Sequence, residues 1–209
     1  MTDDRASTVG LRREPVQRRS RERVDAILAA ATELLAEVEG TEITTTTIAA
    51  RAGVPVGSLY EYFVDREAVI DAVAARMLDR HDEHLRAALT AAPESLEAMV
   101  DALYAAYADF YRAEPAFISL RLSSLYTREH RSWVVERIDH LLADVVKVGA
   151  DAGVLPDDPG LVDRLQLVWA VGDAVLQVGY RSDPRGDPAV IAEGREIVLV
   201  ALARAARAG

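Results

Sequence analysis

The stretch from Thr44 to Arg66, TTTTIAARAGVPVGSLYEYFVDR, constrains the fold of this chain more than any other segment. It predicts two short helices joined by a tight turn. Thr44 can cap the first helix with its hydroxyl, although Thr47 stands where the acid of a capping box usually lies. Gly53 can adopt the left-handed conformation that ends a helix, and Pro55 suits the start of the next one. The spacing predicts a helix-turn-helix.

The second helix of this pair begins with unusually small side chains. Gly57 and Ser58 leave the backbone free to approach a phosphate or a base edge. We expect Leu59 to face the core, and Tyr60 and Tyr62 to point elsewhere, where a phenol can donate to a phosphate oxygen. A helix that starts in this way is suited to enter a DNA groove with its N-terminus.

The pattern Ile-Ala-x-x-Ala-Gly-Val-x-x-Gly-Ser-Leu-Tyr-x-Tyr-Phe-x-x-Arg-Glu at residues 48–67 resembles the DNA-binding domain of the TetR family of transcriptional regulators. The resemblance covers roughly residues 20–75. The alternative, a helical hairpin with core aromatics, does not explain Gly53, Pro55 and Gly57 together. The resemblance implies DNA contact, in the groove or on the backbone, for these residues: Thr45, Thr46, Pro55, Val56, Gly57, Ser58, Tyr60, Tyr62 and Arg66.

Two residues depart from what the family often carries. Val56 stands where a polar or basic side chain often contacts a base, and Glu61 adds an acid to the second helix. We therefore expect few hydrogen bonds to bases, with thymine methyl groups and DNA shape contributing more to specificity.

The charge of the chain is negative overall but positive at its start. A net charge of −10 over 209 residues argues against a general nucleic-acid binder. Residues 5–23, however, hold seven arginines and two glutamates. We predict a flexible arginine-rich arm over residues 1–19 in which Arg18 and Arg19 contact phosphates. For Arg5 to Arg13 a solvated tail is an equal alternative.

Composition excludes several other classes of protein. The chain has no cysteine, no signal peptide and no run of about 18 apolar residues, so we expect a cytoplasmic protein without disulfides. We find no ordered Ser/His/Asp set and no phosphate-binding loop, so we predict no enzyme and no cofactor. The remaining alternatives are a helical enzyme acting in the larger domain and a DNA-binding or scaffold protein without an effector.

The rest of the chain is helical by its apolar periodicity, with proline and glycine between the helices. We predict an all-α fold with a three-helix helix-turn-helix domain over 20–66 and a larger helical effector-binding and dimerisation domain over 67–209. A fourth helix, about 66–90, links them. The first predicted helix begins at Ser20, which we take as its cap, and spans about 20–38. The remaining predicted helices span about 93–111, 115–125, 128–152, 161–180 and 188–208.

The last two helices, 161–180 and 188–208, are apolar on more than one face. Such helices must be covered on two sides, one of which a second copy can provide. We therefore predict a homodimer through these helices, with Gly172, Gly179 and Gly194 allowing close approach there. A two-fold dimer implies a palindromic DNA operator. The alternative is a monomer with a wide core.

Aromatic residues gather in the middle of the larger domain, where the family resemblance implies a pocket for a small, largely apolar effector that releases a repressor from DNA. Candidate ligand residues combine aromatic rings with polar groups on apolar helices: Tyr104, Tyr107, Tyr111, Arg121, Trp133, Gln166, Trp169 and Asp173. The alternative is that these side chains fill the core. His81 and His84 share a helix face, which we interpret as a solvated polar face rather than a metal site.

Overall fold

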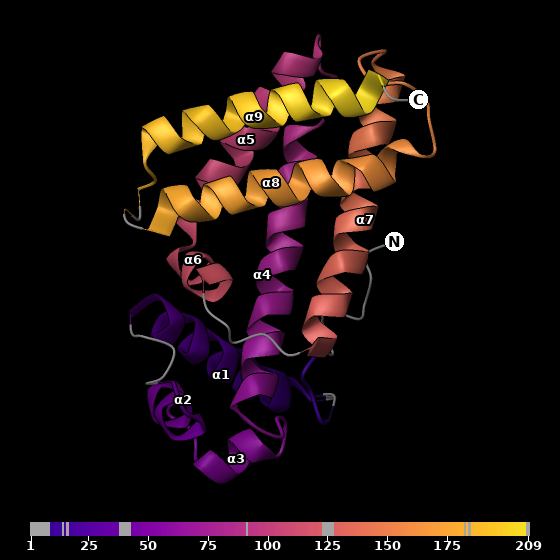
Figure 1. Cartoon of the computed structure of the whole chain (residues 1–209). Coiled ribbons are helices and arrows are strands. Elements are labelled where there is room, and N and C mark those ends of the chain that lie inside the picture. The colour runs from indigo at the N-terminus through magenta and orange to yellow at the C-terminus, as the bar shows by residue number, and fades with distance from the viewer. Residues whose placement is uncertain are drawn as a thin grey trace. The chain divides into compact units, whose positions relative to one another are not determined.

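The computed structural model describes residues 9–13, 15, 17–37, 43–90, 92–122, 128–181, 183 and 185–207, with the backbone alone at 122 and 128–133. Every regular element in these ranges is a helix, which confirms the predicted all-α fold (Figure 1). Each of these helices is too short or too polar to cross a membrane. In chain order they are α1 (Arg18–Glu37), α2 (Thr45–Ala52), α3 (Val56–Tyr60), α4 (Arg66–Ala88), α5 (Leu96–Ala113), α6 (Pro115–Leu122), α7 (Arg128–Asp151), α8 (Leu161–Arg181) and α9 (Pro188–Arg207).

The described residues form two compact units. Unit 1 comprises those of residues 1–80 and 115–131, and unit 2 comprises those of residues 81–114 and 132–209. Helix α4 contributes to both units. The division predicted from the sequence, 20–66 and 67–209, places α6 in the second domain instead, and it stays a prediction.

In unit 1, helix α1 provides the apolar base on which α2 and α6 pack. Val24, Ile27, Leu28, Ala31, Leu34 and Leu35 recur every three or four residues and are buried. Arg51 of α2 donates to Glu33 and Glu37 of α1, which ties the two helices together at the surface. Helix α1 begins at Arg18, two residues before the predicted cap, Ser20. Ser20 lies inside the first turn, where its hydroxyl donates to the carbonyl of Gln17.

The two ends of α2 show how the sequence fixes its length. Thr44 caps the helix by accepting from the N–H of Thr47 at 3.1 Å. The side chain of Thr47 accepts in return from the N–H of Thr44 at 2.8 Å, so a capping box does form, with a threonine in place of the acid. Gly53 ends the helix with φ 66°, as predicted.

Unit 2 contains the long pair α8 and α9, which run side by side (Figure 1). Glycines allow this close packing within one chain. A Cβ at Gly172 would lie 3.1 Å from Cγ2 of Val198, and a Cβ at Gly194 would collide with Val175. The prediction that these glycines serve a dimer interface is therefore wrong: their missing side chains are needed inside the subunit.

Candidate DNA-binding face and effector cavity

The first turn of α2 and the end of α3 meet through two residues predicted to bind DNA. The hydroxyls of Thr45 and Tyr60 lie 3.0 Å apart and form a hydrogen bond. The ring of Tyr60 is 44% exposed, although Leu59 beside it is fully buried. This bond holds the Tyr60 hydroxyl at the surface, where it can also reach a phosphate oxygen.

The start of α3 is open to solvent. Pro55 and Gly57 are exposed, as is Thr46 on α2, while Val56 and Ser58 are half-buried. A Cβ added to Gly57 would meet no atom of the chain within 4 Å, and its φ is not positive. Packing among the described residues therefore does not require glycine here.

Tyr62 does not point away from the core as we predicted from the sequence. Its side chain is only 6% exposed. Helix α3 is short, and the chain leaves it through a tight turn in which the N–H of Tyr62 donates to the carbonyl of Leu59. This turn carries the ring to the buried side. The carbonyl of Tyr62 accepts from the N–H of Arg12, so the N-terminal segment lies against the end of α3.

The arginines of unit 1 differ in how strongly their side chains are paired with other groups of the chain. Arg66 donates to Glu67 at 2.6 Å and to the carbonyl of Ile43 at 3.4 Å. The pKa of Glu67 is lowered, first by a backbone N–H and then by Arg66. Arg18 pairs with Glu22 but is 90% exposed, and Arg19 is exposed. A phosphate would compete with Glu67 for Arg66 but would find the arginines of α1 accessible.

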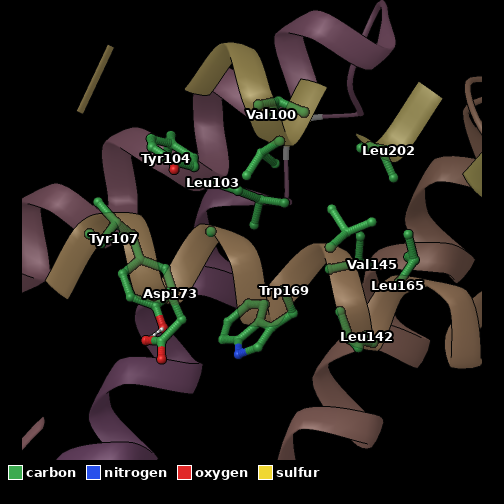
Figure 2. Close-up of a pocket in the computed structure, with 14 residues that line it drawn as sticks. Val100, Leu103, Tyr104, Tyr107, Leu142, Val145, Leu165, Trp169, Asp173 and Leu202 are labelled. Carbon is green, nitrogen blue, oxygen red and sulfur yellow. Dashed lines mark hydrogen bonds between the residues drawn. The ribbon is translucent and has the colours of Figure 1, made fainter. Parts of the chain in front are cut away.

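Unit 2 contains a cavity of about 80 Å³ between α5, α7, α8 and α9, which we call the effector cavity because the sequence predicts an effector site in this domain (Figure 2). Its wall is almost wholly apolar. Four of the predicted ligand residues line it: Tyr104, Tyr107, Trp169 and Asp173. The other lining residues are Val100, Leu103, Leu142, Val145, Leu165, Val168, Gly172, Leu176, Val198 and Leu202.

Three of the predicted ligand residues do not line this cavity, and Trp133 has a side chain outside the described residues. Tyr111 is fully buried against Tyr180, with ring centres 4.8 Å apart, because it faces the core one turn beyond Tyr107. Gln166 is exposed and donates to Asp139, since it lies on the outer side of α8. Arg121 belongs to α6 in unit 1.

The polar groups near the cavity are few. The hydroxyl of Tyr107 donates to the carboxylate of Asp173 at 3.3 Å, as Figure 2 shows, and the amide of Gln177 donates to the same carboxylate at 2.8 Å. Tyr104 is 9% exposed, and its burial raises the pKa of its hydroxyl to about 12.

His81 is buried, so its interpretation as part of a solvated face is wrong. Its ring packs edge-on against Tyr107 at 4.5 Å and approaches Trp169 at 6.4 Å, because this part of α4 faces α5 and α8. Asp82 beside it is also buried and accepts from Arg137 at 2.6 Å. His84 is exposed. Within the described residues, no group of three His, Asp or Glu side chains could hold a metal.

Sequence reasoning missed most of the cavity wall. The missed side chains are valines and leucines from all four helices, such as Val100, Leu142 and Val198. They follow the same periodicity as core residues, so no signal in the sequence separates the two groups. His81 was missed because two acids beside it suggested a polar surface.

Family comparisons agree with this arrangement of helices. Residues 27–73 match the family described as bacterial regulatory proteins, tetR family. Residues 92–206 match the family described as tetracyclin repressor-like, C-terminal domain. The chain belongs to the TetR family. The predicted resemblance is confirmed, and this TetR-family protein is a DNA-binding transcriptional regulator.

Solved structures of other regulators share the fold. A TetR-family transcriptional regulator from Streptomyces coelicolor is 28% identical, with a TM-score of 0.68 over 88% of this chain and 98% of that chain. The fatty acid degradation regulator FadR from Bacillus halodurans is 21% identical, with a TM-score of 0.68 over 85% and 94%. SmeT, the repressor of the multidrug efflux pump SmeDEF of Stenotrophomonas maltophilia, is 18% identical, with a TM-score of 0.62 over 87% and 89%. No curated protein gives a significant match.

Proposed function

We propose that this TetR-family regulator is a homodimeric repressor that binds a palindromic operator and is released from it by a small, largely apolar effector. The observation that carries the proposal is the effector cavity, which lies in the same chain as a helix-turn-helix. A protein that only binds DNA needs no such cavity. An enzyme would need catalytic groups in it, and its wall is almost wholly apolar.

The proposed DNA face consists of the accessible residues of α2 and α3: Thr45, Thr46, Pro55, Val56, Gly57, Ser58 and Tyr60. Gly57 supports this assignment, because its lack of a side chain serves no contact within the chain. Arg18, Arg19 and Arg66 would add contacts to phosphates, and the ring of Tyr62 would support the turn beneath them. Since few of these groups reach base edges with hydrogen bonds, specificity would depend partly on DNA shape.

The proposed dimer interface lies on the outer faces of α8 and α9. Large apolar side chains remain exposed there, namely Leu167 at 72%, Val178 at 52%, Ile197 at 41% and Val200 at 54%. Exposed apolar side chains gathered on neighbouring helices are typical of surfaces that bind another protein. A two-fold axis through these helices would pair each helix with its copy and would present two DNA faces to one palindrome.

Helix α4 is the proposed connection between the two functions. Its first residue follows the helix-turn-helix directly, and its last turns belong to unit 2. There His81 packs on Tyr107 and approaches Trp169, and both of these rings line the effector cavity. An effector that moves either ring would bias the position of α4, which is the coupling that release from DNA requires.

Selection of bound sequences from random duplex DNA with the purified chain tests this proposal. We expect a palindromic sequence whose affinity falls steeply with salt, because phosphate contacts release counterions. A subsequent screen should yield a small apolar compound that raises the melting temperature of the protein and releases the selected DNA. Enrichment of no sequence, or binding that no compound changes, would contradict the DNA and effector parts of the proposal respectively.

A further inference from the structure

We propose that the effector cavity selects an apolar ligand that carries one uncharged hydrogen-bond acceptor, and that the hydroxyl of Tyr104 donates to this acceptor. This inference rests on the proposed function, because it names the chemical class of the effector for that cavity. It follows from three features of the wall: its apolar surface, one buried hydroxyl and one carboxylate.

The apolar surface comes from all four surrounding helices, for example Leu103 on α5, Val145 on α7, Leu165 on α8 and Leu202 on α9. Contact with such side chains favours ligands in proportion to the apolar area that they bury. The volume of about 80 Å³ exceeds the roughly 10–15 Å³ that one water requires. A ring or a short chain can therefore begin to occupy the cavity.

Tyr104 provides an unused donor at this wall. Its ring lies between two glycines: a Cβ at Gly172 would be 4.0 Å from ring carbon Cε2, and a Cβ at Gly194 would be 2.8 Å from the hydroxyl oxygen. This oxygen is buried and has no hydrogen-bond partner among the described residues. A buried hydroxyl without a partner is unfavourable, so a ligand that offers an acceptor gains from pairing with it.

The hydroxyl oxygen is covered, so it reaches a ligand only when the ring tilts towards the cavity. This tilt gives the Tyr104 hydroxyl a hydrogen-bond partner that it otherwise lacks, and the new hydrogen bond favours the tilt. Burial raises the pKa of the hydroxyl to about 12, so the group keeps its proton at neutral pH and acts as a donor.

Asp173 disfavours acidic ligands. Its carboxylate accepts from two neutral donors, Tyr107 and Gln177, and no basic residue stands among the lining residues that the structure describes. A ligand carboxylate would lose its water next to another negative charge. An uncharged acceptor, such as a carbonyl group, avoids this cost.

Four compounds with nearly the same skeleton test the inference by calorimetric titration of the full chain: acetophenone, ethylbenzene, 1-phenylethylamine and benzoate. We expect acetophenone to bind about 5-fold more tightly than ethylbenzene, as one hydrogen bond provides, and at least about 10-fold more tightly than benzoate. The Tyr104→Phe variant should lose the preference for acetophenone over ethylbenzene. Tyr111→Phe, which alters a buried tyrosine of the same helix outside the cavity, should keep it.

Tighter binding of benzoate or of the amine would overturn the inference, as would a Tyr104→Phe variant that keeps the preference or a failure of all four compounds to bind. Melting curves of each variant confirm that it is folded. Binding of the selected palindrome by the same preparations is measured separately. Loss of that binding contradicts the proposed function, whereas an altered ligand order contradicts only the ligand class.

Discussion

The proposed DNA face and the proposed effector cavity of this TetR-family regulator are built from residues of opposite kinds. The proposed DNA face contains residues that the packing does not need, such as Gly57, where an added Cβ would meet no atom of the described residues within 4 Å. The cavity contains residues that any helical core would accept, such as Leu103 and Val145. A site is therefore visible in a sequence when its residues have no use for folding, and it is hidden when they have the same chemistry as the core.

Loss of dimerisation should have the largest effect, because it should weaken DNA binding strongly and ligand binding hardly at all. We expect Leu167→Glu with Val200→Glu to give a monomer, because both side chains are exposed on the proposed interface. Its affinity for the palindrome should fall at least about 100-fold, since two linked DNA faces gain this much from acting together. Ligand binding should change less than about 3-fold, because the cavity lies within one subunit.

Sedimentation and fluorescence anisotropy measure these effects. Val135→Glu on α7 is the matched control, since Val135 is 55% exposed but lies outside α8 and α9. A double variant that stays dimeric would show that the interface lies elsewhere.

Alkaline pH should lower the stability of unit 2 through Tyr104, which lines the cavity. Burial raises the pKa of Tyr104 above its ordinary value of 10 to about 12 in the folded chain, so the protonated form is favoured by folding. This contribution is complete below pH 10 and is lost as the pH rises through 12, at a cost of about 2 kcal/mol. Tyr104→Phe should reduce the loss of stability over this range in urea unfolding. Tyr180, whose pKa burial also raises, should account for part of the remainder.

Two glycine substitutions in the helix-turn-helix should have different effects, one on operator affinity and the other on the free energy of unfolding. Gly57→Ala should weaken operator binding about 10-fold or more, because the new methyl group stands where DNA must approach. Its unfolding free energy should stay equal or rise by up to about 1 kcal/mol, as alanine favours the helix. Gly53→Ala should instead lose about 1–2 kcal/mol of stability, since its φ is 66°.

Anisotropy with the selected operator and chemical unfolding distinguish these two results. An unchanged affinity for Gly57→Ala would remove Gly57 from the DNA face.

The smallest effect is expected for the hydroxyl of Tyr60. Tyr60→Phe removes the bond to Thr45 and a donor to phosphate, and both are exposed to water. We expect operator affinity to fall about 3-fold, which corresponds to less than 1 kcal/mol. Thr45→Val tests the same bond from its other end. A larger loss for Thr45→Val would mean that Thr45 itself contacts DNA.

The fold and the helices of the helix-turn-helix could be predicted largely from local rules. Gly53 ends α2 because glycine tolerates the positive φ of a helix end, and Pro55 precedes α3 because its φ is fixed and it has no N–H. Such local effects do not depend on distant contacts. Tyr62 was predicted less well, since a tight turn rather than helical periodicity decides where its ring points. Thr47 completed a capping box because a hydroxyl can accept as a carboxylate does.

The cavity and the buried histidine could not be predicted in the same way. Whether Tyr111 or Tyr104 lines a cavity depends on how α8 and α9 pack, and this packing depends on glycines that the sequence suggested for a dimer. His81 is buried because rings of α5 and α8 pack against it, although its neighbours in sequence are charged. Properties that arise from several helices together need the structure.

The central claim is that a two-fold symmetric dimer binds both halves of a palindromic operator. The stoichiometry and affinity of the complex with the selected operator test this claim most directly. We predict two chains on one palindromic duplex, a steep fall of affinity with salt, and a loss of at least about 100-fold when one half-site is scrambled. A single chain bound with equal affinity to the intact and the half-scrambled duplex would contradict the account.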